Sequence, residues 1–373
     1  MVLSQLVLSD FRNIKSCDIS LSERCNVFYG DNGSGKTSLL EAVYLFWNSR
    51  SFRTARLSEI VAHQHNDFLI HGKVSDTESD FPFGLSYAGR EKERIAKFNG
   101  EKVRRSSQLA AMLPVYYFSP QSDAILSGSP GNRRNLLFWY LFHVEPKFNE
   151  NYQYLQKALS SRNKLLKAVV RQDELVFWEK EISRYSIELK RISENQVRDL
   201  HDQFKKECLL SDKEQQGAEL SLFDKLNGLD IHYPWKVDED LESDLASKRE
   251  MEFKLGYTTL GYHKCDLKIG TSQGKKSFSR GEEKSITLTL IISVLKIIAS
   301  KTNKNILVLI DDLMAELDQK FTSMLIQKLS SLPLQLFITT LTKDSLLSTI
   351  EKQFSNFRLF HVKQGDVIEE YNV

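Results

Sequence analysis

The segment YGDNGSGKTSLLEA, from Tyr29 to Ala42, constrains the fold more than any other part of the chain. Gly30 is followed by four residues and then by Gly35-Lys36-Thr37, which is the phosphate-binding loop pattern G-x-x-x-x-G-K-[ST]. The apolar run CNVFY precedes the loop, and apolar residues at helical spacing follow it. Strand, loop and helix in this order predict an α/β fold that binds a nucleoside triphosphate.

The loop residues suit the chemistry of a triphosphate. Backbone N–H groups from Asn32 to Lys36 can point at the β-phosphate, and glycines permit the unusual backbone angles and the close approach. Lys36 supplies a cation for the β- and γ-phosphates, and Thr37 offers a hydroxyl to Mg²⁺ at a helix N-terminus, where the dipole favours anions. The predicted nucleotide-binding residues of the loop are Gly30, Asp31, Asn32, Gly33, Ser34, Gly35, Lys36 and Thr37.

The stretch NILVLIDDL supplies the second half of such a site. Asp311 follows a fully apolar strand and is predicted to hold Mg²⁺, whereas Asp312 is placed to orient or deprotonate the attacking water. Two adjacent buried carboxylates repel each other unless a metal or a proton intervenes, which disfavours a purely structural role. A second apolar run, LQLFITT at residues 334–340, indicates a parallel sheet buried on both faces.

A third motif lies in SFSRGEEKS, residues 277–285. Ser279-Arg280-Gly281 alone could be a turn before a helix, but it precedes a long apolar run and the Asp311 strand. This order resembles the signature motif of ABC-type ATPases, in which the serine hydroxyl and the helix N-terminus bind the γ-phosphate of ATP held by another subunit. Ser279 and Gly281 are therefore candidate nucleotide contacts, and AELD at residues 315–318 resembles the D-loop of that superfamily.

The balance of charged residues limits how the protein could bind nucleic acid. The 373 residues carry 51 Lys and Arg against 49 Asp and Glu, so nucleic acid could be bound only through local basic patches. The candidates for such patches, each of which could instead belong to an ordinary solvated face, are Lys97, Lys102, Arg104 and Arg105 around an Asn99-Gly100 hairpin turn, and Arg133 with Arg134; they become candidates for DNA contact through the family resemblance given below. Four scattered cysteines suit a reducing cytoplasm. The apolar run 286–299 is too short to span a membrane and predicts a buried helix.

A long helical section is predicted over residues 145–210. The residues that repeat at spacings of three and four along it are Leu175, Trp178, Ile182, Tyr185, Leu189 and Ile192. This seam covers about two and a half heptads and indicates either a short helical arm packed on the preceding helix or an ordinary helix pair in the core.

Taken together, these motifs resemble the RecF family of bacterial recombinational-repair ATPases, which are related to the SMC proteins. The residues that carry the resemblance are DFRNI, NGSGKTSLLEA, SFRTA, GSPGNRRNLLFW, FHVEP, LSSRNKLLK, GYTTLGYHKCDL, SFSRGEEKS, IDDLMAELD and FITT. They extend over essentially the whole chain.

The resemblance implies an ABC-type P-loop ATPase head with a β-rich subdomain and an inserted helical arm domain. It implies that the protein binds ATP and Mg²⁺, dimerises on ATP, binds DNA at single-strand gaps and junctions, and helps to load RecA with RecO and RecR. Slow ATP hydrolysis would reset it. Arg12 would contact the nucleotide, and Gln121 would take the place of a Q-loop glutamine; a surface arginine and a loop-capping amide are the alternatives.

The chain departs from the family pattern at six positions. Phe138 replaces an acidic residue, Tyr262 and Cys265 replace a proline and an acid, and Glu282 and Glu283 replace glutamines after the signature glycine. Lys264 stands where the family has an arginine. These changes leave the phosphate loop, the aspartate pair and Ser279 intact, and they bear on signature-helix contacts and on dimer coupling.

The predicted domains are residues 1–140 and 255–373 for the two parts of the head and 141–254 for the arm. Three other functions remain open: an ABC transporter subunit, a small-molecule kinase, or a nearly inactive ATP-gated scaffold. A transporter subunit has a much shorter interval between Lys36 and Ser279, and a kinase needs no signature serine.

Overall fold

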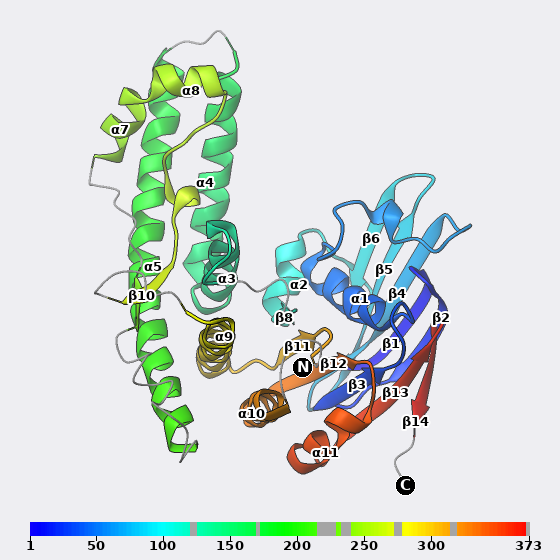
Figure 1. Cartoon of the computed structure of the whole chain (residues 1–373). Coiled ribbons are helices and arrows are strands. Elements are labelled where there is room, and N and C mark those ends of the chain that lie inside the picture. The colour runs from blue at the N-terminus through cyan, green and yellow to red at the C-terminus, as the bar shows by residue number, and fades with distance from the viewer. Residues whose placement is uncertain are drawn as a thin grey trace. The chain divides into compact units, whose positions relative to one another are not determined.

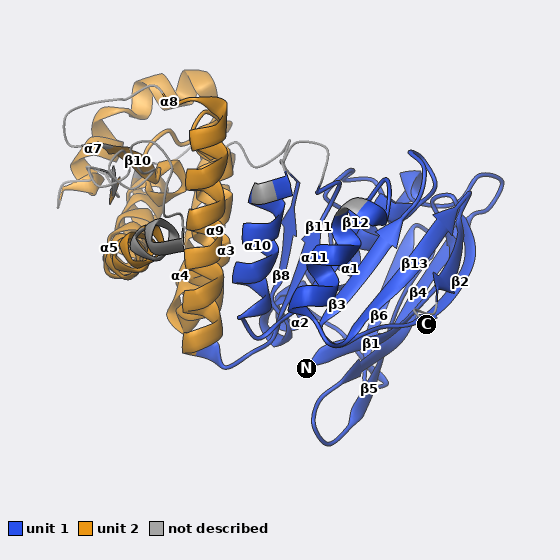
Figure 2. Ribbon diagram, turned by 60° about the horizontal axis from the view of Figure 1, so that its bottom comes forward, with its two compact units in different colours: residues 1–123, 302–373 blue, residues 124–301 orange. Residues whose placement is uncertain are grey.

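The computed structural model describes residues 1–119, 125–168, 172–214, 229–232, 240–271, 278–313 and 319–370. The chain divides into two compact units, coloured separately in Figure 2. Unit 1 consists of residues 1–123 and 302–373, and unit 2 of residues 124–301.

The unit borders differ from the segment borders expected from the sequence. Helix α9 (Arg280–Thr302), predicted to lie in the head, is counted almost wholly with unit 2. Lys296 of α9 forms an ion pair with Glu207 of helix α5 (Gln172–Glu214), with 2.8 Å between Nζ and Oε1, and this contact links α9 to unit 2.

A mostly parallel sheet forms one half of unit 1. Its strand order is β14 (Asp366–Glu370), β13 (Phe357–Lys363), β3 (Cys25–Tyr29), β12 (Leu334–Thr340), β11 (Ile306–Ile310) and β8 (Val115–Phe118) (Figure 1). Only the β13–β14 pair is antiparallel. Every residue of β11 and β12 is buried, which confirms the predicted parallel sheet with two covered faces.

The parallel pairing determines where the functional loops lie. Strands β3, β12 and β11 are neighbours that run in the same direction, so their carboxyl ends meet at one edge of the sheet. The phosphate loop follows β3, and Asp311 follows β11. Ligands of open α/β sheets bind outside this edge.

An antiparallel sheet forms the other half of unit 1. Its order is β2 (Ile14–Ser20), β1 (Val2–Phe11), β4 (Asp67–Ser75), β5 (Asp80–Ala88), β6 (Glu93–Phe98) and β7 (Glu101–Lys102). Burial alternates along β4, as expected of a sheet with one covered face. The predicted hairpin turn is confirmed, because Asn99 and Gly100 have φ of 50° and 80°, the left-handed pair of a type I′ turn.

Helix α1 (Lys36–Asn48) contributes to the core that joins the two sheets of unit 1. Its Trp47 is fully buried and contacts Phe83 of β5 and Phe98 of β6. In the parallel sheet, the ring of Phe28 stacks against Phe337 and Phe360. Two short helices, α2 (Ser106–Met112) and the 3-10 helix η1 (Leu57–Glu59), complete the unit with α10 (Gln319–Ser330) and α11 (Asp344–Gln353).

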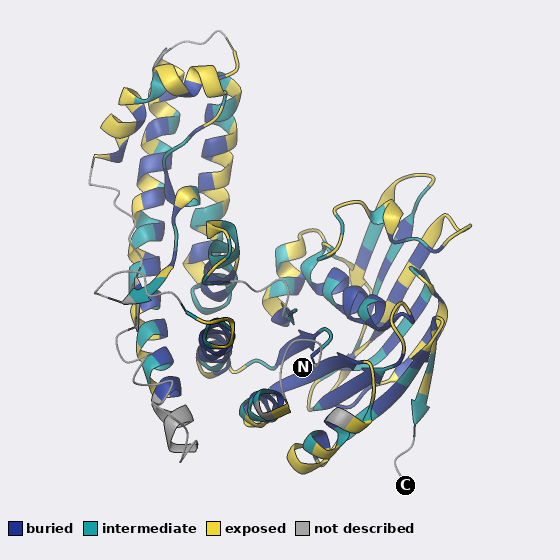
Figure 3. Ribbon diagram, in the orientation of Figure 1, coloured by how far each residue is buried: buried dark blue, intermediate teal, exposed yellow. Residues whose placement is uncertain are grey.

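Unit 2 is mainly helical. Its elements are α3 (Pro130–Val144), α4 (Pro146–Leu165), α5, α7 (Leu241–Ser247), α8 (Arg249–Leu255), α9, a 3-10 helix η2 (Tyr262–Lys264), and the strand pair β9 (Leu229–His232) and β10 (Lys268–Thr271). Helices α4 and α5 pack side by side as the predicted arm (Figure 1). Leu175, Ile182, Leu189 and Ile192 of the predicted seam are buried, whereas the outward faces of both helices are exposed (Figure 3).

Helix α9 contains the apolar run for which the sequence predicted a buried helix. By length and composition it could cross a membrane, but 78% of its most apolar window is buried inside the protein. It is therefore a core helix, in agreement with the prediction.

The stack at Phe28 yields a stability prediction. Phe28→Ala removes a ring that is 1% exposed, and it should lower the free energy of unfolding by about 3–5 kcal/mol because a cavity remains. Urea unfolding measures the change. Leu69→Ala on β4, at a side chain that is 36% exposed, is the control and should cost less than about 1 kcal/mol. Equal effects of the two changes would contradict the assigned core.

Candidate nucleotide-binding site

A cavity of about 650 Å³ opens at the carboxyl edge of the parallel sheet, wholly within unit 1. Predicted residues from three distant stretches of the chain line it together: Arg12, Asn32, Gly33, Gly35, Lys36, Thr37, Asp311 and Asp312. The fold thus brings these predicted residues to one place.

At two positions, the phosphate loop has φ angles and close contacts that suit only glycine. Gly30 has φ of 147°, and a Cβ atom there would lie 2.1 Å from the carbonyl oxygen of Val362. Gly35 has φ of 123° and is the residue before α1. Side chains at either position would combine strained angles with close contacts, so the loop shape follows from these glycines.

Lys36 lies at the base of the loop. Its Nζ donates to the carbonyl oxygens of Gly30 at 2.7 Å and Asp31 at 2.9 Å. Burial lowers the pKa of Lys36 from its ordinary value, and the carboxylates of Asp312 and Asp311 act in the opposite direction. A polyanion in the cavity would oppose the effect of burial in the same way, because it favours the charged ammonium.

Three hydroxyl groups hold the carboxylate of Asp311. Thr37 Oγ1 donates to Oδ1 at 3.1 Å, Thr339 Oγ1 donates to Oδ1 at 2.7 Å, and Tyr117 OH donates to Oδ2 at 3.3 Å. The contact between Thr37 and Asp311 brings together the two groups predicted to hold Mg²⁺. Hydroxyl and carboxylate oxygens are the ligands that Mg²⁺ accepts, with phosphate oxygens and water completing the shell.

The backbone of Asp312 is fixed by a hydrogen bond. It has φ of 50°, an uncommon value for a residue other than glycine, and its N–H donates to Thr339 Oγ1 at 2.8 Å. Thr339 thus binds both aspartates, accepting from one and donating to the other. The strained backbone at a cavity wall suits a functional residue.

Arg12 lies at the edge of the cavity in an ion-pair network. Its guanidinium makes two bonds to Glu41, of 2.9 and 2.7 Å, and donates to the carbonyl oxygen of Glu59 at 2.6 Å. Glu41 is fully buried and also accepts from Ser51 and Arg53. The network holds Arg12 and Arg53 in the cavity wall.

Several site residues were not found from the sequence. Asn13 donates to the carbonyl oxygen of Gly33 and accepts from Ser38, so it braces the loop from β1–β2. The other residues that sequence reasoning missed are Tyr117, Thr339, Glu41, Arg53 and His63. The sequence signal for Asn13 was its position beside Arg12, and that for Thr339 was its position at the end of an apolar strand.

Ser279 lies in unit 2 and precedes the first residue of α9. Its N–H donates to Glu282 Oε2 at 2.9 Å, and the N–H of Glu282 donates to Ser279 Oγ at 3.4 Å. This reciprocal pair is a capping box, a local signature of a helix start. Glu282, a departure from the family pattern, thus stabilises the helix end, while Ser279 and Gly281 stay exposed.

Two predicted features fall outside the described residues. These are Gln121 and the D-loop stretch at residues 315–318. Among the residues that are described, no group of three or more His, Cys, Asp or Glu side chains is placed to hold a metal. A Mg²⁺ bound with a triphosphate needs only one or two protein ligands.

The DNA-contact candidates differ in how free their side chains are. Lys97, Lys102, Arg104 and Arg105 are exposed, and Lys97 lies directly opposite Lys102 across β6 and β7. Like charges opposite each other destabilise a sheet unless an anion compensates, so this hairpin favours an anionic partner.

The second pair of candidates bonds within the protein. Arg133 donates twice to Asp266, at 2.9 Å each, and to the carbonyl oxygens of Ile125 and Gly128. Arg134 donates to the carbonyl oxygen of Cys265. These bonds give both arginines a role in holding the 265–266 segment.

Two departures from the family pattern contact each other. Phe138 and Tyr262 stack with ring centroids 5.5 Å apart, and the hydroxyl of Tyr262 hydrogen-bonds Ser193 of α5. Cys265 is fully buried nearby in sequence. An aromatic pair thus occupies the place of an acid and a proline.

The parallel sheet, its phosphate loop and the inserted helical unit define an ABC-type P-loop ATPase head. Comparison with known proteins agrees: residues 2–366 match the family model of the RecF/RecN/SMC N-terminal domain. The DNA replication and repair protein RecF of Pseudoalteromonas translucida is 34% identical over 99% of this chain and 100% of its own length. That of Hahella chejuensis is 35% identical over 100% of both chains.

Solved structures share the fold. A structure of the recombination mediator protein RecF with ATP, from the RecFOR pathway, has a TM-score of 0.81 at 25% identity and covers 99% of both chains. An SMC head bound to the C-terminal winged-helix domain of ScpA has a TM-score of 0.51 at 16% identity, over 99% of this chain and 98% of that one. The chain belongs to the RecF family.

The double contact of Thr339 yields a prediction. Thr339→Val keeps the side-chain volume but removes the bonds to Asp311 and Asp312, so ATP turnover at saturating Mg²⁺ should fall about 10–100-fold. Thr340→Val, at the next buried threonine, removes only a bond to the carbonyl oxygen of Thr342 and should leave turnover within about twofold. Equal turnover in the two variants would contradict the role assigned to Thr339.

Proposed function

We propose that this protein is an ATP-binding DNA-repair factor that dimerises on ATP and binds DNA at single-strand gaps and junctions. In this role it would help to load RecA together with RecO and RecR. It would also be a weak, DNA-dependent ATPase of the cytoplasm that takes part in DNA replication and the SOS response. The observation that carries the proposal is the contact of Thr37 with Asp311 beside Lys36, in a chain of the RecF family.

The cavity residues suggest how ATP would be held. The N–H groups of the loop and Lys36 would bind the phosphates, and Thr37 with Asp311 would hold Mg²⁺, which supplies charge neutralisation at the β- and γ-phosphates. Arg12 and Arg53 lie in the wall of the same cavity, where their charges favour an anionic ligand. The RecF structure solved with ATP supports this choice of nucleotide.

Hydrolysis requires a group that orients water. Asp312 lines the cavity and has its backbone fixed by Thr339, so it would orient or deprotonate the attacking water. Ser279 would complete the site of a second copy of the chain, because it is exposed at the N-terminus of α9, where N–H groups favour a phosphate. ATP would then bridge two copies.

The DNA role follows from the family and from local charge. The exposed hairpin of β6 and β7 presents Lys97, Lys102, Arg104 and Arg105, which would contact phosphates without reading sequence. The four cysteines are buried and form no disulfide bond with one another, which suits a reducing compartment.

Asp312→Asn tests the proposed base. The change keeps the shape but removes the negative charge, so ATP should still bind while turnover falls by at least about 100-fold. Sedimentation with ATP should then show a lasting dimer. Asp366→Asn, at an exposed position of β14, is the control. Unchanged turnover in Asp312→Asn would exclude this role.

Ser279→Arg tests the cross-subunit site. A large cation at the exposed N-terminus of α9 should block ATP-induced dimerisation and leave ATP affinity within about threefold, as measured by sedimentation and nucleotide titration. Ser300→Arg, at the exposed opposite end of the same helix, should dimerise normally. Dimerisation of the Ser279 variant would contradict the signature assignment.

A further inference from the structure

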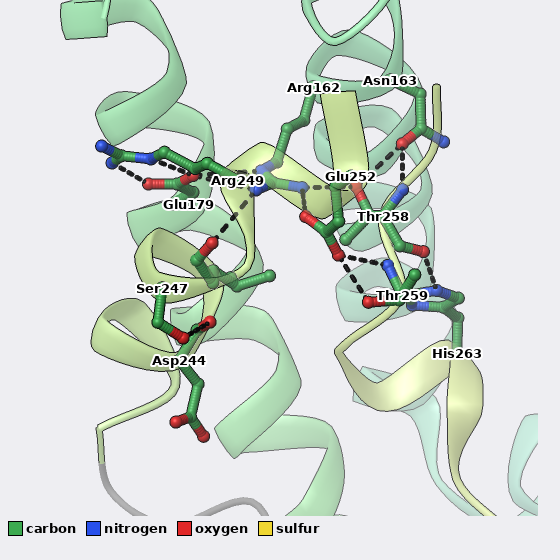
Figure 4. A network of polar contacts seen from close by, with 11 residues as sticks. Arg162, Asn163, Glu179, Asp244, Ser247, Arg249, Glu252, Thr258, Thr259 and His263 are labelled. Atoms are coloured by element: carbon green, nitrogen blue, oxygen red, sulfur yellow. Dashed lines mark hydrogen bonds and ion pairs between the residues drawn. The ribbon is translucent and has the colours of Figure 1, made fainter. Parts of the chain in front are cut away.

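Unit 2 contains a fully buried arginine that anchors its arm. Arg162 of α4 is 0% exposed and binds Glu179 of α5 at 2.9 Å and Glu252 of α8 at 2.5 Å (Figure 4). A buried charge is tolerated only when it is paired and hydrogen-bonded, and here two carboxylates face one guanidinium. Arg249 adds a second cation to Glu179, which balances the charges of the cluster.

The same cluster fixes the segment that follows α8. Thr258 accepts from Arg162 and donates through its N–H and its hydroxyl to Asn163 Oδ1, both at 2.8 Å. Thr259 donates twice to Glu252 (Figure 4). The segment that follows α8 is therefore bonded to α4 through Thr258 and to α8 through Thr259.

A polar groove lies between these two elements. It encloses about 410 Å³, and its lining includes Gln156, Ser160, Asn163, Lys164, Lys167 and His263. Four of these six residues lie at helical spacing on α4 and form one stripe, and Lys167 lies just after the end of the helix. Leu159 is the one aliphatic side chain of the lining.

The charge of the groove has one sign. Besides the paired Arg162, residues 151–168 contain three lysines and no Asp or Glu, and residues 253–265 contain Lys254 and Lys264 and again no Asp or Glu. Of the acids that border these stretches, Glu252 is paired with Arg162 and Asp266 with Arg133. Because the whole chain carries only +2, this concentration of positive charge is local.

The cations that face the groove are lysines. His263 is neutral at pH 7, because burial lowers its pKa to about 4, and it hydrogen-bonds the carbonyl oxygen of Thr258. The stem of Lys167 packs over Gly256, whose added Cβ would lie 3.3 Å from Lys167 Cε. Lys264 lies over the ring of Tyr257, which is 46% exposed.

We infer that this groove, formed by α4 and residues 256–264, binds the phosphodiester backbone of a DNA strand. Positioned lysines beside hydroxyl and amide groups are the donors that phosphate contacts use, and the exposed Tyr257 offers a stacking surface for a base. The inference rests on the proposed DNA-binding function and adds a phosphate-contact site on the helical arm to the hairpin of unit 1.

The salt dependence of DNA binding tests the inference. A Lys164→Ala/Lys167→Ala variant should bind a gapped duplex oligonucleotide more weakly, and the slope of log K against log salt should fall in magnitude by about two. Lys180→Ala/Arg191→Ala, which removes two exposed cations from α5, is the charge-matched control and should keep the slope of the unmodified protein. ATP affinity and thermal stability should be unchanged in both.

A gain of charge provides the opposite test. Gln156→Lys adds a cation at an exposed position of the groove and should increase the slope by about one. If the unmodified protein binds DNA tightly and both groove variants keep its slope, the groove is not a DNA-binding site. That result would leave the proposed function untouched. Absence of DNA binding by the unmodified protein would instead overturn the proposed function.

Discussion

The nucleotide site depends on β12 lying between β3 and β11 in one parallel sheet. This order places the phosphate loop and Asp311 on two strands separated by a third, whose last residues bridge the gap. Thr339, near the end of β12, donates to Asp311 and accepts from the N–H of Asp312. A change in strand order would separate Lys36 from its acidic partners without altering either motif.

Two acidic groups around this edge of the sheet have several hydrogen-bond or ion-pair partners. Asp311 accepts from three hydroxyls, and Glu41 accepts from two arginines and a serine. An unpaired charge in such surroundings would cost several kcal/mol, roughly, and would disrupt the cavity wall. Arg162 is paired in the same way in unit 2, with Glu179 and Glu252. This buried cluster holds the segment that lines the polar groove.

Features encoded by neighbouring residues were predictable from the sequence. The loop glycines, the apolar strands, the Asn99-Gly100 turn and the buried α5 seam are all local patterns, and the structure confirms them. Thr339, Tyr117 and Glu41 were not predictable, because their roles depend on partners brought close only by folding. The bonds of Arg133 to Asp266 were missed for the same reason, since 133 positions separate the partners.

The proposed function requires that Lys36 of one copy and Ser279 of another act on the same nucleotide. A mixture of Lys36→Ala and Ser279→Arg proteins tests it most directly, because one of the two composite sites in a mixed dimer keeps both residues. We expect each variant alone to lack ATP turnover and ATP-induced dimerisation, and the equimolar mixture to regain a substantial part of both. A mixture as inactive as its components would contradict the claim.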